Sequence, residues 1–197
     1  MTLEDLINQY VKRRNKMDNF QAIKKEFYNE TISNPNLNSS SINSFYNATF
    51  RDSTLTNIKL ENLYFNSSYF NGCLLENCIF DNIDFEFAEF QKCNFKNCFF
   101  IDCYLHDSDF NEIIFNQCQF KMTANGNGNL SFAWFKSCHF IKPVFIFNDH
   151  TEYAGLAGTI LKDVRFSNGN RTVEFEGKSY FSDLFDNNET ILKDFIN

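Results

Sequence analysis

A period of five residues dominates the middle of this chain and constrains its fold more than any other feature. Every fifth position from Phe45 to Phe145 gives 21 sites, of which fifteen are Phe, five are Leu and one is Asn125. Two positions earlier in each block the residue is mostly small or aliphatic, and all seven cysteines fall on this second phase. Five residues turn an α-helix by roughly 500°, so the apolar positions would wind around it. The period therefore excludes a helix here.

An extended chain with this period must bend once in every block. Residues two apart in a strand point the same way, so the two apolar sites of one block share a face. The next small site lies three residues further on and would point outward unless a corner intervened. A chain that bends after each short strand winds into a tube with its apolar side chains on the axis. Its stacked turns hydrogen-bond to one another at a spacing of about 4.8 Å.

Several blocks of this tube resemble the pentapeptide repeat family. They include Cys-Ile-Phe-Asp-Asn at 78–82, Ala-Glu-Phe-Gln-Lys at 88–92 and Cys-Asn-Phe-Lys-Asn at 93–97. The resemblance implies an all-β solenoid, a right-handed quadrilateral parallel β-helix of about five coils over residues 41–150, with one block per side.

Recurrence of residues at a spacing of 20 agrees with four blocks per coil. Asn57, Asn77 and Asn97 form one such series, and Lys96 would lie over Glu76. The longest series consists of four cysteines, namely Cys78, Cys98, Cys118 and Cys138.

Both ends of the chain depart from the five-residue pattern. In residues 1–40 we expect two short amphipathic helices, one from Leu3 to Val11 and one ending near Phe27, followed by a polar linker over Asn34–Ser41. These helices would cap the unpaired end of the tube. Residues 151–197 predict a hairpin around 164–175 and a helix over 182–195, which form a second cap or a dimerisation surface.

A polar segment at 121–129 interrupts the tube. It contains Asn125, Gly126, Asn127, Gly128 and Asn129, and its length preserves the five-residue phase. The segment either replaces two sides of a coil or bulges outward. A projecting loop is a candidate interaction element, and a slack corner is the alternative.

The cysteines and histidines do not suggest catalysis. Each cysteine stands where Ala, Ser or Ile stands in other blocks, which is typical of small core residues, so we expect reduced thiols and no metal. His106 and His139 fall on outward phases and have no nucleophile at a recognisable spacing. We therefore expect a protein that is not an enzyme and binds no cofactor.

Acidic residues are concentrated in the central coils. The net charge of the chain is −7, and residues 61–120 contain ten acids and two bases, a net of −8. Over three coils this is about one charge per 1.8 Å, close to the value for duplex DNA. One side carries Asp84, Glu86 and Asp107 and no base, which makes it a candidate acidic interaction face. Solvated acids that keep the rod soluble are the alternative reading.

Outward apolar residues form a second candidate surface. Leu74, Ile114 and Trp134 are expected to align along one side, with Ile79 and Phe99 on the adjacent side. Such a patch is either covered by a terminal segment or used by a partner.

These patterns favour a non-catalytic scaffold that presents a regular surface to a protein partner. The family resemblance implies an alternative, a DNA mimic that binds DNA gyrase or topoisomerase IV and modulates it or protects it from inhibitors. A third possibility is an assembly role as a homodimer through the C-terminal segment. The acidic balance argues against direct binding of nucleic acid, and no apolar run or signal peptide points to a membrane, so we expect a cytoplasmic protein, of bacterial type.

Overall fold

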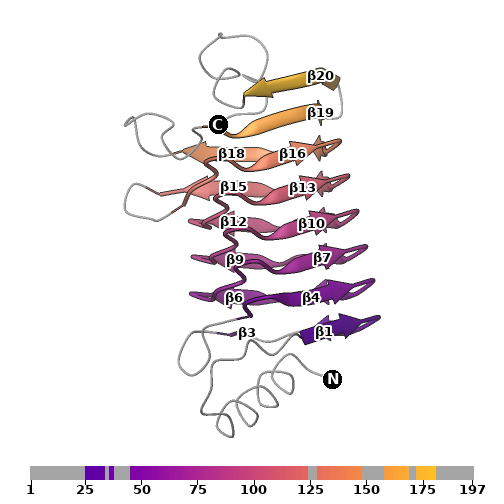
Figure 1. The fold of residues 1–197 in the computed structure, drawn as a ribbon, viewed down its shortest axis with the longest axis vertical. Helices are drawn as coiled ribbons and strands as arrows, with labels where there is room; N and C mark the ends of the chain where they lie inside the picture. Colours follow the sequence, from indigo (N-terminus) through magenta and orange to yellow (C-terminus); the bar gives the residue numbers. More distant parts are fainter. Residues whose placement is uncertain are drawn as a thin grey trace, which may run out of the picture.

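A computed structural model shows a tube of short parallel strands stacked along its axis (Figure 1). It describes residues 25–33, 36–37, 45–123, 128–147, 158–168 and 172–180. Over these residues the chain is an all-β solenoid, and no helix occurs among them.

The strands form three columns, which we call faces 1 to 3. Face 1 stacks β1 (Lys25–Tyr28), β4 (Ala48–Arg51), β7 (Tyr69–Asn71), β10 (Glu89–Gln91), β13 (Asp109–Asn111) and β16 (Trp134–Lys136). Face 2 stacks β2 (Thr31–Ser33), β5 (Thr54–Thr56), β8 (Leu74–Glu76), β11 (Asn94–Lys96), β14 (Ile114–Asn116) and β17 (His139–Ile141). Face 3 stacks β3 (Asn36–Leu37), β6 (Lys59–Glu61), β9 (Ile79–Asp81), β12 (Phe99–Ile101), β15 (Gln119–Met122) and β18 (Val144–Phe147).

A fourth side, face 4, closes the tube without regular strands. Its tiers are joined by single parallel bridges that run from Tyr64 to Asp84, from Asp84 to Tyr104 and from Tyr104 to Asn129. Because each central tier visits the four faces in order, one block of five residues supplies one side.

Phenylalanine rings stacked along the axis fill the tube. On face 1 the rings of Phe50, Phe70, Phe90 and Phe110 follow one another with centroids 4.6 to 4.8 Å apart. All four side chains are buried. Full burial of such a side chain contributes roughly 1.5–3 kcal/mol. The five-residue period is therefore the period of this core.

Left-handed backbone makes the corners. From residue 47 to residue 117 every fifth residue has a φ near +50° to +64°. Six of these fifteen residues are Asn, three are Asp and one is Gly72, which are the residue types that tolerate this conformation best. The corner N–H donates to a carbonyl of the next tier, as in the bond of 3.0 Å from Asn57 to Glu76. Asn and Asp together thus provide most of these turns in a chain with few Gly and Pro residues.

Polar ladders predicted from the sequence are present on the outside. Asn77 Nδ2 donates to Asn57 Oδ1 over 3.2 Å, and Asn97 Nδ2 donates to Asn77 Oδ1 over 3.1 Å. Lys96 Nζ lies 2.7 Å from Glu76 Oε1, as expected.

The tube begins before residue 41, which corrects the predicted N-terminal boundary. Strand β1 places Phe27 against Phe50, and β3 lies in the segment expected to be a linker. Phe27, Ile32 and Leu37 keep the five-residue spacing, but Leu37 and Phe45 are eight positions apart, so the first tier is out of phase with the later ones. The first predicted helix, over Leu3–Val11, lies outside the described residues. The second was expected to end near Phe27, which is wrong because Lys25–Tyr28 is a strand.

The predicted C-terminal hairpin is confirmed and is also joined to the tube. Strands β19 (Ile160–Ser167) and β20 (Thr172–Tyr180) pair antiparallel. β19 continues faces 1 and 2, because it pairs in parallel with both β16 and β17. The helix expected over 182–195 lies outside the described residues. In the part of the chain that the structure describes, no helix has the length and apolar character needed to cross a bilayer.

The polar segment at 121–129 adds one block to its tier. Glu89 pairs with Asp109 at a separation of 20 residues, whereas Asp109 pairs with Trp134 at a separation of 25. Neither side of this tier is missing, because β15 occupies face 3 and Asn129 occupies face 4. At the start of the segment, Thr123 N and Oγ1 donate to the two carboxylate oxygens of Asp102 over 2.6 and 2.7 Å. Asn125, Gly126 and Asn127 lie outside the described residues.

Candidate interaction surface

The interior of the tube is packed with side chains and contains buried thiols. All seven cysteines are free and buried. Burial raises the pKa of Cys103 and of Cys138 to about 12, and Cys103 Sγ donates to the Phe80 carbonyl over 3.3 Å. Within the described residues no three His, Cys, Asp or Glu side chains are grouped as metal ligands would be. Any site in this part of the chain is therefore on the outer surface.

The stack of cysteines at a spacing of 20 is shorter than predicted. Cys78 and Cys98 start consecutive blocks of face 3 and donate to Leu55 and Leu75 carbonyls. Cys138 instead starts a block of face 2 and donates to the Phe110 carbonyl. The extra block at 121–129 causes this shift.

Face 4 brings together the three acids predicted to form an interaction face. Asp84 and Glu86 share one tier, where Glu86 N donates to Asp84 Oδ1 over 2.9 Å. Asp107 belongs to the next tier and its Oδ2 lies 3.0 Å from His106 Nδ1. Their role in binding stays a prediction.

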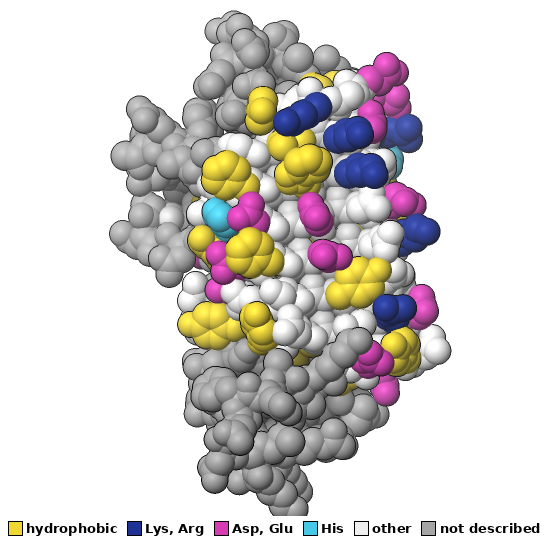
Figure 2. Space-filling model, in the orientation of Figure 1, with side chains coloured by type: hydrophobic (Ala, Val, Ile, Leu, Met, Phe, Trp, Pro, Cys, Tyr) yellow, Lys and Arg dark blue, Asp and Glu magenta, His cyan; other side chains and the backbone are white. Residues whose placement is uncertain are grey.

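Exposed aromatic side chains lie among these acids, and sequence reasoning missed them. Tyr64 is 47% exposed, Phe87 52% and Phe132 51%. Tyr104 is half-buried and stacks on His106 with a centroid distance of 5.6 Å. Figure 2 shows hydrophobic and acidic side chains intermingled along this side of the molecule.

The same mixture continues around the corner onto face 1. Its first outward column runs Tyr69, Glu89, Asp109, Trp134, one residue per tier. These four side chains line a shallow groove of about 380 Å³ together with Gln91, Asn111 and Lys136 of the neighbouring column. Burial, followed by the charge of Asp107, raises the pKa of Asp109.

We call the outward side chains of residues 63–69, 83–89, 103–109 and 128–134 the aromatic–acidic surface. These four segments contain no Lys and no Arg. They contain five carboxylates, namely Asp84, Glu86, Glu89, Asp107 and Asp109. Their aromatic members that point outward are Tyr64, Tyr69, Phe87, Tyr104, Phe132 and Trp134. The surface is therefore a strip with negative charge and exposed rings.

Phe87 and Phe132 occupy positions that the fold does not favour for them. Their φ angles are 57° and 58°, and both are corner residues of the kind that is usually Asn or Asp. A bulky side chain in left-handed backbone is an outlier, and here the ring is also half exposed to water. They stand in one corner column on either side of Asp107.

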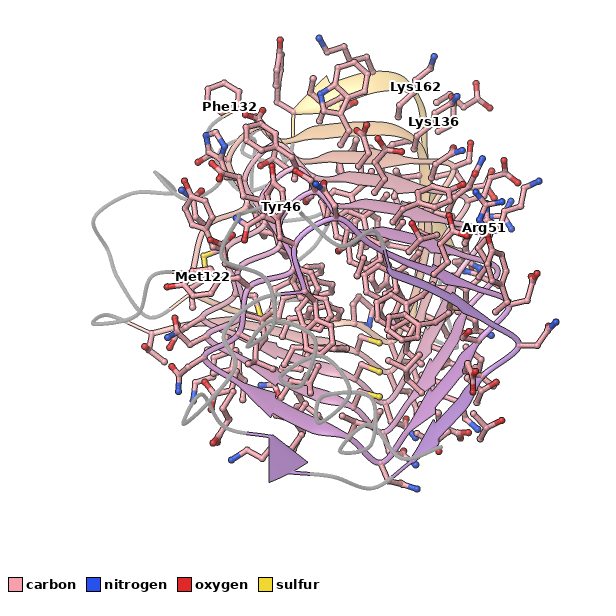
Figure 3. The ribbon with its side chains drawn as sticks, turned by 60° about the horizontal axis from the view of Figure 1, so that its bottom comes forward. Tyr46, Arg51, Met122, Phe132, Lys136 and Lys162 are labelled. Carbon is pink, nitrogen blue, oxygen red and sulfur yellow. The ribbon has the colours of Figure 1, made fainter. Side chains whose placement is uncertain are left out.

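Basic residues are gathered beside this surface rather than on it. The second outward column of face 1 contains Arg51, Lys136 and Lys162. Figure 3 shows these three projecting from one edge of the tube, apart from Phe132.

The predicted apolar patch is divided between faces. Trp134 was expected to align with Leu74 and Ile114, but it lies on face 1, and His139 takes the place over Ile114. This prediction is wrong because the extra block keeps the five-residue phase while moving every later residue by one face. Leu74 and Ile114 share face 2 with Asn94 between them.

The two remaining members of the patch are neighbours. Ile79 and Phe99 pair directly on face 3, as expected, and Phe99 is exposed. Of the predicted loop, Asn129 lies on face 4 and its N–H donates to the Cys103 carbonyl over 3.0 Å. Gly128 precedes it, close to Met122.

Comparison with known proteins identifies the repeats but not an activity. The family model for pentapeptide repeats matches eight copies, with matched residues 44–82, 68–107 and 83–121. No curated protein matches the chain.

Several solved structures are similar at low identity. HetL, a pentapeptide repeat protein involved in heterocyst differentiation regulation in the cyanobacterium Nostoc sp. strain PCC 7120, is 11% identical with a TM-score of 0.42, and the alignment covers 83% of this chain and 81% of HetL. QnrB1, a plasmid-mediated fluoroquinolone resistance protein, is 18% identical with a TM-score of 0.32 over 73% of this chain and 69% of QnrB1. Rfr23 from the cyanobacterium Cyanothece 51142 is 16% identical with a TM-score of 0.31 over 64% of this chain and 86% of Rfr23.

The repeats found in the sequence, the parallel tube and the match of the family model agree with one another. Residues 44–121 of this chain match the pentapeptide repeat family.

Proposed function

We propose that this protein is a non-catalytic binding scaffold that presents the aromatic–acidic surface to a protein partner. The observation that carries the proposal is the pair of phenylalanines at the corners. Phe87 and Phe132 occupy strained positions and are each about half exposed. Phe132 lies against Gly158 and edge-on to the His106 ring, yet its side chain is still 51% exposed. Residues that break a local rule without a structural gain are expected at functional sites.

The regular tube suits such a role. Successive tiers hold outward side chains about 4.8 Å apart on a rigid, packed core. We include in the proposal the right-handed twist and the coil number that the family resemblance implies. A helical cap over Leu3–Val11, which the spacing of apolar residues predicts, is also part of it. Location in the cytoplasm belongs to it as well.

A comparison of captured proteins tests the scaffold. The wild type, a Phe87→Asn/Phe132→Asn variant and a Phe99→Asn control would each be immobilised and exposed to a lysate of source cells, with quantitative mass spectrometry of the bound proteins. Phe99 is also an exposed phenylalanine, but it lies on face 3. We expect a partner retained by the wild type and the control and lost by the double variant. Identical sets of bound proteins for all three would contradict the proposal.

A second candidate function is imitation of duplex DNA toward a type II topoisomerase. The absence of Lys and Arg from the four segments of the aromatic–acidic surface favours it. It predicts that excess protein changes supercoiling by DNA gyrase or topoisomerase IV and that Asp84→Lys, Glu86→Lys and Asp107→Lys together remove the effect. No change in supercoiling at stoichiometric excess would eliminate this candidate.

Assembly through the C-terminal segment remains a separate prediction. Residues 181–197 lie outside the described residues, so the test is in solution. Sedimentation is expected to show a dimer that becomes a monomer on deletion of residues 176–197. A monomer at high concentration would contradict it.

A further inference from the structure

We infer that the aromatic–acidic surface binds an extended, arginine-rich segment of a partner polypeptide. The inference rests on the proposed scaffold function and specifies the chemistry of the partner. Three features of the surface support it: its excess of carboxylates over basic side chains, its exposed rings and the cations that already stack at its two ends.

The carboxylates call for a cationic partner. Asp84 and Glu86 lie on face 4, Glu89 lies around the corner in the same tier, and Asp107 and Asp109 are in the next tier. The four segments that form the surface contain five carboxylates and no Lys or Arg. The basic side chains beside these carboxylates are His106, 3.0 Å from Asp107, and Lys136, which lines the same groove as Glu89 and Asp109. Opposite charge on a partner would both steer its approach and fix its register.

The rings favour arginine over lysine. Phe87 and Phe132 stand on either side of Asp107 in one corner column, with their rings half exposed. A guanidinium group is planar and weakly hydrated, so it can lie on an aromatic face while its N–H groups reach a carboxylate. The compact, strongly hydrated ammonium of lysine fits this alternation of rings and acids less well.

The protein already places its own cations on the rings at both ends of this strip. At one end the Arg51 guanidinium carbon lies 5.5 Å from the ring centroid of Tyr69. At the other end Lys178 Nζ lies 6.0 Å from the ring centroid of Trp134. Phe87, between them, has no such neighbour among the described residues. The Phe87 ring in the middle of the strip can therefore stack on a cation of the partner, whereas the rings at the two ends already lie next to cations of the protein itself.

The shape of the surface favours an extended segment. The strip follows the tube axis over four tiers, and three steps of about 4.8 Å make about 14 Å. Four to five residues of extended chain span this length at roughly 3.3 Å per residue. Alternate residues of such a segment point to the same side, so every second residue would be the arginine that contacts the strip.

Labelled peptides test the inference directly. Fluorescence anisotropy would measure binding of a fluorescein-labelled peptide of four Arg-Ser repeats to the full chain, alongside Lys-Ser and Glu-Ser peptides of the same length. We expect the arginine peptide to bind several-fold tighter than the lysine peptide and the glutamate peptide not to bind. Replacing both rings with Phe87→Asn/Phe132→Asn should weaken arginine-peptide binding about tenfold, whereas the Phe99→Asn control should bind like the wild type.

A second variant separates the charges from the rings. Glu89→Gln/Asp109→Asn removes two carboxylates from the groove without changing the size of the side chains. We expect about fivefold weaker binding and a smaller dependence on salt concentration. Asn is the commonest corner residue of this tube, so the double asparagine variant should fold, and its circular dichroism and melting curve verify this.

Equal affinity for the arginine and lysine peptides, or equal affinity of the wild type and the double asparagine variant, would overturn the inference. The capture experiment then locates the error. If the double asparagine variant still loses a captured protein, the scaffold stands and only the partner's chemistry is wrong. If it loses none, the scaffold proposal fails too.

Discussion

Replacing Phe87 with asparagine should leave the stability of the protein nearly unchanged. Left-handed backbone costs an ordinary L-residue roughly 1–2 kcal/mol, and asparagine avoids part of this cost through local hydrogen bonds. The exchange should therefore recover about 1 kcal/mol. The corner hydrogen bond from residue 87 N to the His106 carbonyl, 3.1 Å long, uses only backbone atoms and is kept.

Against this gain stands the loss of the buried part of the ring. Full burial of a Phe side chain contributes roughly 1.5–3 kcal/mol, and Phe87 is 52% exposed, so its removal should cost about 1 kcal/mol. The two effects nearly cancel, and we expect the free energy of unfolding to change by no more than about 0.5 kcal/mol.

Urea unfolding followed by circular dichroism measures this difference. Gln117→Asn is the matched control, because Gln117 is also a corner residue, with φ 54°, but contributes no ring. It should be slightly stabilising, and the difference between the two variants reports the contribution of the ring alone. A loss of more than about 1.5 kcal/mol for Phe87→Asn would show that the ring is structural and would remove the main argument for a binding role.

Three further predictions concern the core, the ladder and the thiols. Phe110 is fully buried, and its ring stacks between those of Phe90 and Phe135 with centroid distances of 4.7 Å. Phe110→Ala should lower the free energy of unfolding by about 3–5 kcal/mol in the same urea assay, and a loss below about 1 kcal/mol would contradict the packed core. Asn77→Ala removes two ladder hydrogen bonds of 3.1 and 3.2 Å and should cost about 1 kcal/mol by thermal unfolding. An unchanged melting curve would contradict a stabilising role for the ladder. The Cys103 thiol ionises near pH 8.5 when unfolded but has a pKa of about 12 when folded, so its contribution to stability is present below pH 8.5 and is lost between that pH and 12. Between pH 7.5 and pH 10.5 the urea midpoint should therefore fall less for Cys103→Ala than for the wild type. Equal decreases in the two proteins would refute this.

The regular part of the fold follows from the sequence, because one period serves both the core and the turns. Phe80 and Phe85 are buried as the spacing of five requires. The corner residues lie two positions after each core position, and asparagine is the commonest residue among them. Its frequency at that position of the block was a usable signal for left-handed backbone.

Insertions account for the errors. The step of eight positions from Leu37 to Phe45 changed the phase, so the first tier was not recognised, although Phe27 and Leu37 themselves keep the five-residue spacing. The extra block near residue 125 had the opposite effect, since it preserved the phase and placed Trp134 on the wrong face. A phase repeats every five residues, but a face repeats only every four blocks, so phase alone does not determine the face.

The candidate surface was found only in part for a related reason. Asp84, Glu86 and Asp107 belong to one face and were recognised by their charge. The rings of Phe87 and Phe132 were not recognised, because a phenylalanine in a chain whose core is built of phenylalanine is assigned to the core until the corner positions are known. Their phase, two residues after Phe85 and Leu130, marks them as outward.

Trp134 offers the most direct test of the central claim that the aromatic–acidic surface is where this protein binds. It is the chain's single tryptophan and is 44% exposed at one end of the groove. Titration of the wild type with the unlabelled peptide of four Arg-Ser repeats should change the intrinsic tryptophan fluorescence saturably, and the Phe87→Asn/Phe132→Asn variant should need about tenfold more peptide for the same change. A tryptophan signal that stays constant, or one that saturates identically in both proteins, would contradict the account.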